Sequence, residues 1–255
     1  MNDNGKPKSG KETPPLRVEA VRKSFGAQKV LNGISLEAAR GETVSVLGKS
    51  GTGKSVLLKV MIGLQQADSG SIRVHGEELQ GLPREGLNEL RRKMGFLFQN
   101  AALYDSLTVE QNVAFPLERH SGLPREKKKK RARELLAAVG IEEGLDKLPG
   151  EISGGMQKRV GLARALALEP DILLCDEPTA GLDPITASEI DALILKMQKD
   201  RHMTSIVVTH DLPSARTISD RLALMRDGMI VVEGSFEELQ ESKDSFVREF
   251  MNRGS

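Results

Sequence analysis

The chain has 255 residues, enough for one large α/β domain or two small ones. Charged residues make up 29%, hydrophobic residues 38%, the net charge is +1, and there is no Trp, one Tyr and seven Phe. Nothing in this balance indicates a nucleic-acid surface, and the few rings exclude a base-stacking platform. The single cysteine, Cys175, cannot form an internal disulfide, which fits a reducing compartment.

The N-terminal stretch, residues 1–15, is rich in Gly, Pro, Lys and Asn and has no apolar centre. We expect a disordered tail there rather than a secretory signal. No apolar run approaches the eighteen or so residues that a membrane span needs. We therefore expect a cytoplasmic chain, with any membrane span supplied by other chains.

Short apolar segments bounded by turn residues predict strands along the chain. In chain order they are Leu16–Val21, Leu31–Ala38, Thr43–Leu47, Ser71–His75, Met94–Phe98, Ile172–Cys175, Ser205–Val208 and Leu222–Met225. Helices are expected from Lys54 to near Gly63 and through Ile185–Lys199. Strands that alternate with helices predict an α/β domain with a largely parallel sheet covered on both faces.

Between about residues 100 and 160 the pattern becomes helical, and Pro124 is well placed to start a helix. This stretch is predicted to be an insertion in the α/β core. It contains a basic run, Lys127–Arg131, which we interpret as a solvated helix face without a function. The last residues, 241–255, are expected to form a C-terminal helix and tail.

A phosphate-binding loop is predicted where an apolar strand meets a helix. Residues 48–55, GKSGTGKS, match the pattern G-x-x-x-x-G-K-[ST]. Glycines let the backbone turn its N–H groups towards phosphates, and the helix start adds further N–H groups and a partial positive charge. Lys54 is expected to reach the β- and γ-phosphates, and the Ser55 hydroxyl to hold Mg²⁺. The expected nucleotide-binding residues here are Gly48, Lys49, Ser50, Gly51, Thr52, Gly53, Lys54, Ser55 and Val56.

Two carboxylates, Asp176 and Glu177, end the apolar strand that starts at Ile172. In this arrangement the first acid orders Mg²⁺ and the second polarises the attacking water. A kinase takes its nucleophile from a substrate and needs no second acid, so the pair favours hydrolysis. His210 follows another strand and is predicted to contact the γ-phosphate as a third catalytic residue beside Lys54 and Glu177.

A second anion site is predicted at Ser153-Gly154-Gly155, at the start of a periodic helix. One nucleotide does not need two such sites. We therefore expect this one to serve a nucleotide held by a second copy of the chain.

Together these motifs resemble the ATP-binding cassette (ABC) ATPase family over residues 16–240. They occur in the family's order: the phosphate loop, the Q-loop Gln99, the signature Ser153–Gly155, the acids Asp176 and Glu177, the D-loop Asp183 and the switch His210. The resemblance implies a P-loop NTPase (RecA-like) core, an N-terminal antiparallel β-subdomain and an inserted α-helical subdomain that carries the signature.

The family further implies how ATP and Mg²⁺ are held. Two cassettes sandwich two ATP molecules, with Ser153, Gly154, Gly155 and Asp183 acting on the partner's nucleotide. Phe25 stacks on adenine, where the family more often has Tyr. Gln99 joins Ser55 and Asp176 around Mg²⁺.

Met156 stands where the family commonly has Gln. This residue and the stretches Leu47–Leu58 and Leu97–Leu117 are similar to the branch that serves MCE-protein lipid transporters, the systems for maintenance of lipid asymmetry. That branch implies phospholipid cargo and four kinds of partner: a second cassette, an integral membrane permease, an MCE-domain protein and a small STAS-like subunit. It places the chain on the cytoplasmic face of the inner membrane, with no nucleic acid bound.

Three alternatives remain open at the level of sequence. The chain can be the ATPase of a polar amino-acid or other small-solute importer. A cassette acting on ribosomes or DNA is less favoured, because no second cassette, long coiled-coil insertion or basic surface is seen. A scaffold without hydrolysis would be expected to lack Lys54 or Glu177. The apolar residues of Asn100–Leu117 can form either core or a docking groove for a permease helix.

Overall fold

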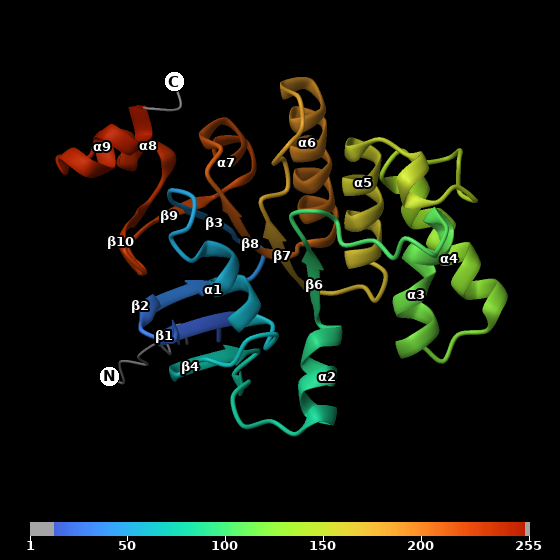
Figure 1. Cartoon of the computed structure of the whole chain (residues 1–255), viewed down its shortest axis with the longest axis horizontal. Coiled ribbons are helices and arrows are strands. Elements are labelled where there is room, and N and C mark those ends of the chain that lie inside the picture. The colour runs from blue at the N-terminus through green and yellow to red at the C-terminus, as the bar shows by residue number, and fades with distance from the viewer. Residues whose placement is uncertain (1–12, 253–255) are drawn as a thin grey trace, which may run out of the picture.

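The computed structural model describes residues 13–252, which form two β-sheets surrounded by helices (Figure 1). The first sheet is antiparallel, with the strand order β2-β1-β4-β5. Its strands are β1 (Leu16–Phe25), β2 (Gln28–Ala38), β4 (Ser69–Val74) and β5 (Glu77–Glu78). The antiparallel sheet implied by the resemblance is therefore present.

The second sheet has the order β10-β9-β3-β8-β7-β6 and is parallel except for the β9–β10 pair. Its strands are β3 (Thr43–Leu47), β6 (Met94–Leu97), β7 (Ile172–Asp176), β8 (Thr204–Thr209), β9 (Arg221–Arg226) and β10 (Met229–Gly234). Every residue of β3, β7 and β8 is buried, because the sheet is covered on both faces. The predicted largely parallel sheet is confirmed.

The helices in chain order are α1 (Lys54–Met61), α2 (Arg84–Arg92), α3 (Val109–His120), α4 (Arg125–Ala138), the 3-10 turn Pro149–Glu151, α5 (Gly154–Ala165), α6 (Pro184–Arg201), α7 (Leu212–Ile218), α8 (Phe236–Gln240) and α9 (Ser245–Asn252). Helices α5 and α6 stand side by side, and α3 and α4 lie beyond α5, away from the first sheet (Figure 1). Within residues 13–252 no helix has both the length and the apolarity of a membrane span.

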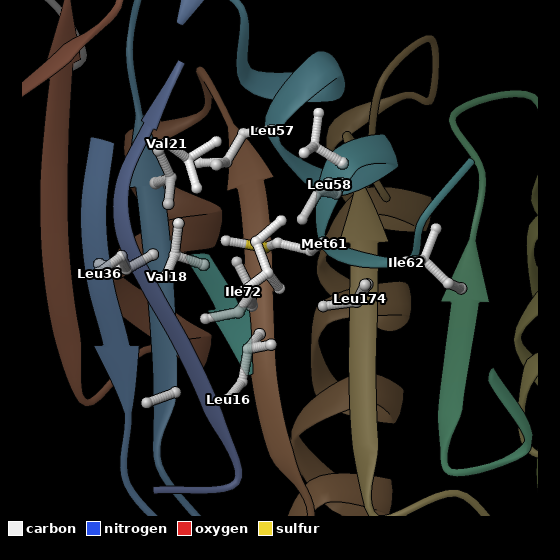
Figure 2. Packing of buried hydrophobic residues seen from close by; sticks show 14 of the residues in the cluster. Leu16, Val18, Val21, Leu36, Leu57, Leu58, Met61, Ile62, Ile72 and Leu174 are labelled. Atoms are coloured by element: carbon white, nitrogen blue, oxygen red, sulfur yellow. The ribbon is translucent and has the colours of Figure 1, made fainter. Parts of the chain in front are cut away.

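Helix α1 packs into a core that it shares with both sheets. Figure 2 shows Leu57 and Met61 of α1 among Val18 and Val21 of β1 and Ile72 of β4, all of them buried. The same cluster includes residues of β3, β7 and β8. This shared core fixes the helix that follows the phosphate loop against the end of β3.

A second core joins the helical stretch to the other face of the parallel sheet. Val113 of α3, Leu136 of α4 and Val160 of α5 pack in one cluster with Leu173 and Cys175 of β7. Burial raises the pKa of the Cys175 thiol to about 12. The thiol is therefore protonated at neutral pH, as expected of a small packing residue.

The basic run Lys127–Arg131 lies on α4, for which Pro124 is the N-cap residue as predicted. Its Lys129 is 3.9 Å from Glu110, and Arg131 is 2.7 Å from Glu169. These exposed and half-exposed ion pairs fit the solvated face that the sequence predicts.

Strand β1 is longer than predicted and continues to Phe25. Ala20 has a φ of 49°, and the pairing with β2 shifts register between Val18 and Val21. Such a bulge breaks the alternation on which the strand prediction depends. Helix α2 was not predicted, because its sequence REGLNELRR buries only Leu90.

Residues 1–12 of the predicted tail and residues 253–255 lie outside the described residues. Pro15, which the sequence assigned to the tail, is buried, and its carbonyl accepts the N–H of His75 at 2.8 Å. The packed chain therefore begins before Leu16. At the other end, Val247 and Met251 of α9 pack in a third core with Leu212 of α7.

Candidate nucleotide site

The predicted phosphate loop connects the buried end of β3 to the first turn of α1. Gly53 is the N-cap residue and has a φ of 101°, a left-handed conformation that favours glycine. A β-carbon at Gly48 would lie 2.8 Å from the carbonyl oxygen of Met225. Both glycines are therefore required by the path of the backbone, as well as by the expected approach of phosphate.

Lys54 is the cation at the centre of this loop. It is 5% exposed, and its Nζ donates to the carbonyl oxygens of Gly48 at 2.8 Å and Lys49 at 3.2 Å. The same Nζ lies 3.3 Å from Oε1 of Glu177. The loop thus folds around an ammonium group that is already paired with Glu177, the residue after β7.

Ser55 and Asp176 meet at the end of β7, where the Ser55 hydroxyl donates to Oδ1 of Asp176 at 2.7 Å. Burial raises the pKa of Asp176, and the hydrogen bond from Ser55 opposes this shift. A hydroxyl beside a carboxylate is a donor set that suits Mg²⁺. Within residues 13–252 no cluster of three or more His, Cys, Asp or Glu is found.

Glu177 and His210 form the other half of the site. Nδ1 of His210 lies 2.9 Å from Oε2 of Glu177, and the His210 backbone N–H donates to the same oxygen at 3.3 Å. The Glu177 side chain is 9% exposed, whereas that of His210 is 62% exposed. The structure therefore brings together Lys54, Glu177 and His210, which are far apart in the sequence.

The signature and D-loop residues lie at two neighbouring helix starts. Ser153 caps α5 by accepting the N–H of Met156 at 3.2 Å, and Asp183 caps α6 by accepting the N–H groups of Ile185 and Thr186 at 3.1 Å. The hydrogen bonds from Thr186 lower the pKa of Asp183, which keeps it ionised. Each residue thus has a local capping role beside any role towards a nucleotide.

The two signature glycines differ in their surroundings. A β-carbon at Gly155 would lie 2.6 Å from Cγ2 of Thr186, so this glycine is required by the packing of α5 on α6. At Gly154 the nearest atom to such a β-carbon is 3.9 Å away. The sequence interpretation gave both glycines to phosphate contact, and for Gly155 it missed this packing within the chain.

The remaining predicted residues lie around the mouth of the loop. Lys49, Ser50 and Gly51 are exposed, Thr52 is half-buried, and Val56 packs against the first core. Phe25, at the end of β1, is 46% exposed, and the Lys23 ammonium group lies 5.3 Å from its ring centroid. Nearly half of the Phe25 side chain is therefore accessible.

Gln99 follows β6, is exposed, and joins the site through its backbone carbonyl, which accepts a hydrogen bond from Lys158. Lys158 also donates to the carbonyl of Glu177 at 3.1 Å. The sequence analysis gave Lys158 no role. The available signal was a lysine two residues before the apolar run VGLARALAL, on the same helix.

The apolar stretch Asn100–Leu117 is divided between core and surface. Val109, Val113 and Leu117 are buried in the second core. Tyr104 is 47% exposed and lies against Phe115, with 4.6 Å between the ring centroids. Both rings line a hollow of about 490 Å³ between β6, α3 and α5. The core interpretation is confirmed for the buried residues, and docking by the exposed ones stays a prediction.

The fold and the loop around Lys54 define a P-loop nucleotide-binding domain. Residues 31–180 match the ABC transporter family. The chain therefore belongs to that family and is an ATP-binding cassette of its ATPase class.

Curated relatives include the methionine import ATP-binding protein MetN of Rhizobium johnstonii, which is 42% identical over 219 residues, covering 86% of this chain and 60% of that protein. The probable ribonucleotide transport ATP-binding protein mkl of Mycobacterium tuberculosis is 40% identical over 237 residues, covering 93% of this chain and 66% of that protein. The chain thus spans about 60% of the length of the MetN proteins it matches.

Among solved structures, the dimeric post-hydrolysis state of the ATP-binding cassette MJ0796, bound to ADP and Pi, superposes with a TM-score of 0.80 at 34% identity. The match covers 86% of this chain and 98% of that one. The cassette fold predicted from the sequence is confirmed.

Proposed function

We propose that this chain binds MgATP and hydrolyses it as the motor subunit of an ABC transporter. The observation that carries the proposal is the position of the Glu177 carboxylate, 3.3 Å from the Lys54 ammonium group and 2.9 Å from the His210 ring. A base, a phosphate-binding cation and an orienting imidazole are the groups that hydrolysis of a phosphoanhydride requires.

Each side chain has a definite role in this proposal. Lys54 exchanges its carbonyl partners and Glu177 for phosphate oxygens when ATP binds. The freed Glu177 carboxylate then accepts a hydrogen bond from the attacking water and takes up its proton. His210 holds the Glu177 carboxylate in place and presents its exposed ring edge to the γ-phosphate. Ser55, Asp176 and Gln99 would hold Mg²⁺, which would supply positive charge to the phosphates when bound.

The first prediction concerns Glu177. Glu177→Gln retains MgATP binding but hydrolyses it about 10²–10⁴-fold more slowly, because the amide cannot accept the proton. Lys54→Ala instead weakens nucleotide binding itself. Fluorescent-nucleotide titration and phosphate release separate the two effects. Glu241→Gln, at an exposed acid after α8, is the matched control and keeps normal turnover. Near-normal hydrolysis by Glu177→Gln would remove Glu177 from the role of base.

In the proposed working unit two copies of the chain form each complete site. Ser153, Gly154, Gly155 and Asp183 of one copy act on the nucleotide that the phosphate loop of the other copy holds. Support comes from the position of the first two at the open end of a helix, where backbone N–H groups attract anions, and from the dimeric state of MJ0796. Binding of ATP favours the closed pair, and hydrolysis releases it.

The hollow beside Gln99 is the proposed docking place of a membrane permease, which sets the chain on the cytoplasmic face of the membrane. Its walls carry Phe98, Tyr104, Phe115 and Leu168. An apolar groove with two partly exposed rings suits an amphipathic helix. Because Phe98 and Tyr104 lie on either side of Gln99 in the sequence, movement of the docked helix is passed to the segment that joins the nucleotide site.

For the cargo we propose phospholipid, delivered with an MCE-domain protein and with a small STAS-like subunit bound. Support comes from Met156 in the signature and from the likeness of Leu47–Leu58 and Leu97–Leu117 to that branch. A second candidate is import of an amino acid or another small solute. The 42% identity to a methionine import ATP-binding protein favours it.

Purification of the chain with its membrane partners tests docking and cargo together. We expect a multi-span permease, an MCE-domain protein and bound phospholipid. Tyr104→Asp, at a side chain 47% exposed in the hollow, should lose the permease while the cassette still binds ATP. Val231→Asp, at a residue 46% exposed on β10, is the matched control and should keep it.

Two outcomes would contradict these proposals separately. A co-purifying permease that carries no lipid and comes with a soluble amino-acid receptor would favour the importer. Retention of the permease by Tyr104→Asp would contradict the docking place and leave the cargo open.

A further inference from the structure

Lys158 is a buried cation that the proposed reaction does not use. It lies on α5, five residues after the signature serine, and is 5% exposed. Its Nζ donates to the backbone carbonyl of Gln99 and, at 3.1 Å, to that of Glu177. Burial lowers the pKa of Lys158, and the nearby Asp176 carboxylate opposes this shift. A buried ammonium group bonded to carbonyls from two separate segments fixes those segments relative to each other.

One of the two segments contains Glu177, where its backbone is strained. This residue has a φ of 46°, a backbone conformation that residues other than glycine and asparagine rarely adopt. Its N–H donates to the carbonyl of Val208 at 2.9 Å, and its own carbonyl accepts Lys158 and the N–H of Ala180 at 3.2 Å. These bonds stabilise a backbone turn that aims the carboxylate at Lys54 and His210.

The second segment follows β6 and lies along one face of α5. Lys158 holds the carbonyl of Gln99, and Arg164 donates to the carbonyls of Ala101 at 2.6 Å and Ala102 at 2.7 Å. Between them, a β-carbon at Gly161 would lie 3.0 Å from Cβ of Ala101. Residues three apart on a helix share a face, so these three positions seat the segment directly on α5.

We propose that Lys158 is a positioning residue that joins the backbone of Gln99 to the backbone of Glu177. These bonds hold Glu177 in its left-handed backbone conformation, so that its carboxylate stays directed at Lys54 and His210. They also hold the segment after Gln99 against α5. This inference rests on the proposed role of Glu177 as the base. On this inference, α5 is the element through which a partner bound in the hollow lined by Phe98 and Tyr104 affects the rate of hydrolysis.

The experiment is a double-mutant cycle with Glu177→Gln. Lys158→Met keeps the length of the side chain and removes the ammonium group. We expect its kcat for ATP to fall about 10–100-fold while the Kd for MgATP changes less than about threefold, because an interaction that only positions the base acts on the reaction step. Lys127→Met, at an exposed lysine of α4, is the matched control and keeps the wild-type kcat.

In the Glu177→Gln background, single-turnover hydrolysis should slow less than about twofold on adding Lys158→Met, because both changes disable the same group. If the two losses multiply in full, or if Lys158→Met leaves kcat unchanged, the proposal is overturned. A loss confined to the Kd overturns it as well. Normal turnover by Glu177→Gln would overturn the assignment of the base, and this proposal with it.

Thermal unfolding and the Kd for MgATP report whether Lys158→Met folds. Should it not fold, Lys158→Gln takes its place in the cycle, because its shorter neutral side chain cannot bond both carbonyls. It has to give the same pattern of losses.

Discussion

At the scale of single residues, a buried carboxyl group that the sequence does not indicate lies between α6 and α7. Asp191 of α6 is 5% exposed, and its Oδ1 accepts the hydroxyl of Ser214 of α7 at 2.6 Å. Burial raises the pKa of Asp191 to about 6, the bond from Ser214 opposes the shift, and the charge of Asp211 adds to it. This pair joins the helix that follows Asp183 to the helix that follows His210.

The pKa of Asp191 predicts how stability depends on pH. Its folded pKa of about 6 lies above the ordinary aspartate value of 3.8, so the protonated carboxyl stabilises the fold below pH 4 and that contribution is lost as pH rises through 6. A difference of about two pKa units between the folded and unfolded chain corresponds to about 3 kcal/mol in the free energy of unfolding. Asp191→Asn does not ionise, so its free energy of unfolding should rise relative to wild type by about this amount between pH 4 and 7.

Urea unfolding at several pH values measures this difference. Asp227→Asn, at a side chain 80% exposed, is the control, and its difference from wild type should stay flat over the same range. A flat difference for Asp191→Asn would mean that Asp191 titrates as it does in the unfolded chain.

At the scale of elements, the first turns of α5 and α6 pack against each other where Gly155 approaches Thr186. Gly155 lies in the first turn of α5, and Thr186 in the first turn of α6. The hydroxyl of Thr186 donates to Oδ2 of Asp183 at 2.6 Å, so its methyl group is held towards Gly155. The signature and the D-loop are therefore joined by a direct packing contact within the chain.

Gly155→Ala tests this contact. Alanine in a helix is normally favoured over glycine by about 1 kcal/mol. Here its β-carbon would lie 2.6 Å from the Thr186 methyl carbon, so we expect a net loss of about 1–3 kcal/mol in the free energy of unfolding. Thr186→Ser removes that methyl group, keeps the hydroxyl and should restore stability in the double variant. Gly154→Ala, whose β-carbon would meet its nearest atom at 3.9 Å, should not lower stability and should raise it by up to about 1 kcal/mol.

Chemical denaturation of the four proteins provides the values. Equal losses for Gly154→Ala and Gly155→Ala, with no recovery by Thr186→Ser, would contradict the contact.

At the scale of the whole molecule, the predicted site residues fall into two separate groups. The phosphate loop, Asp176, Glu177 and His210 gather at the ends of β3, β7 and β8, whereas Ser153 and Asp183 cap α5 and α6. The contacts of the second set join the two helix starts to each other. This division is what the proposed pairing of two copies requires.

Mixing variants tests the pairing. Ser153→Arg and Lys54→Ala should each be inactive alone. A mixed dimer contains one intact composite site, with Lys54 from one copy and Ser153 from the other. An equimolar mixture should therefore recover roughly a quarter of wild-type phosphate release, since half of the dimers are mixed and each has one working site of two. Wild-type and Glu177→Gln proteins provide the upper and lower limits.

Glu177→Gln should also elute as a dimer with ATP on a sizing column. Full hydrolysis by a strict monomer, at a rate per chain that does not change with concentration, would rule out the composite site.

The sequence by itself determined the cassette and the residues of the phosphate loop and acid pair. Their chemistry depends on local order: a strand, a glycine-rich turn and a helix start are adjacent in the chain, so the spacing of Gly48, Lys54 and Ser55 already fixes their geometry. Asp176 and Glu177 follow from the same logic at the end of an apolar strand. The buried strands were also predictable, because apolar residues dominate β7 and recur in β3 and β8.

Only the tertiary structure decided the contacts between segments that are distant in sequence. Four features each depend on a partner elsewhere in the chain. They are the bulge at Ala20, the contact of Gly155 with Thr186, the Asp191–Ser214 pair and the hydrogen bonds of Lys158. Neither the period of a strand nor that of a helix specifies such a partner. The partner is set by how the sheets and α5 pack. Removing it costs stability, because a buried polar group that loses its hydrogen-bond partner cannot bond to water instead.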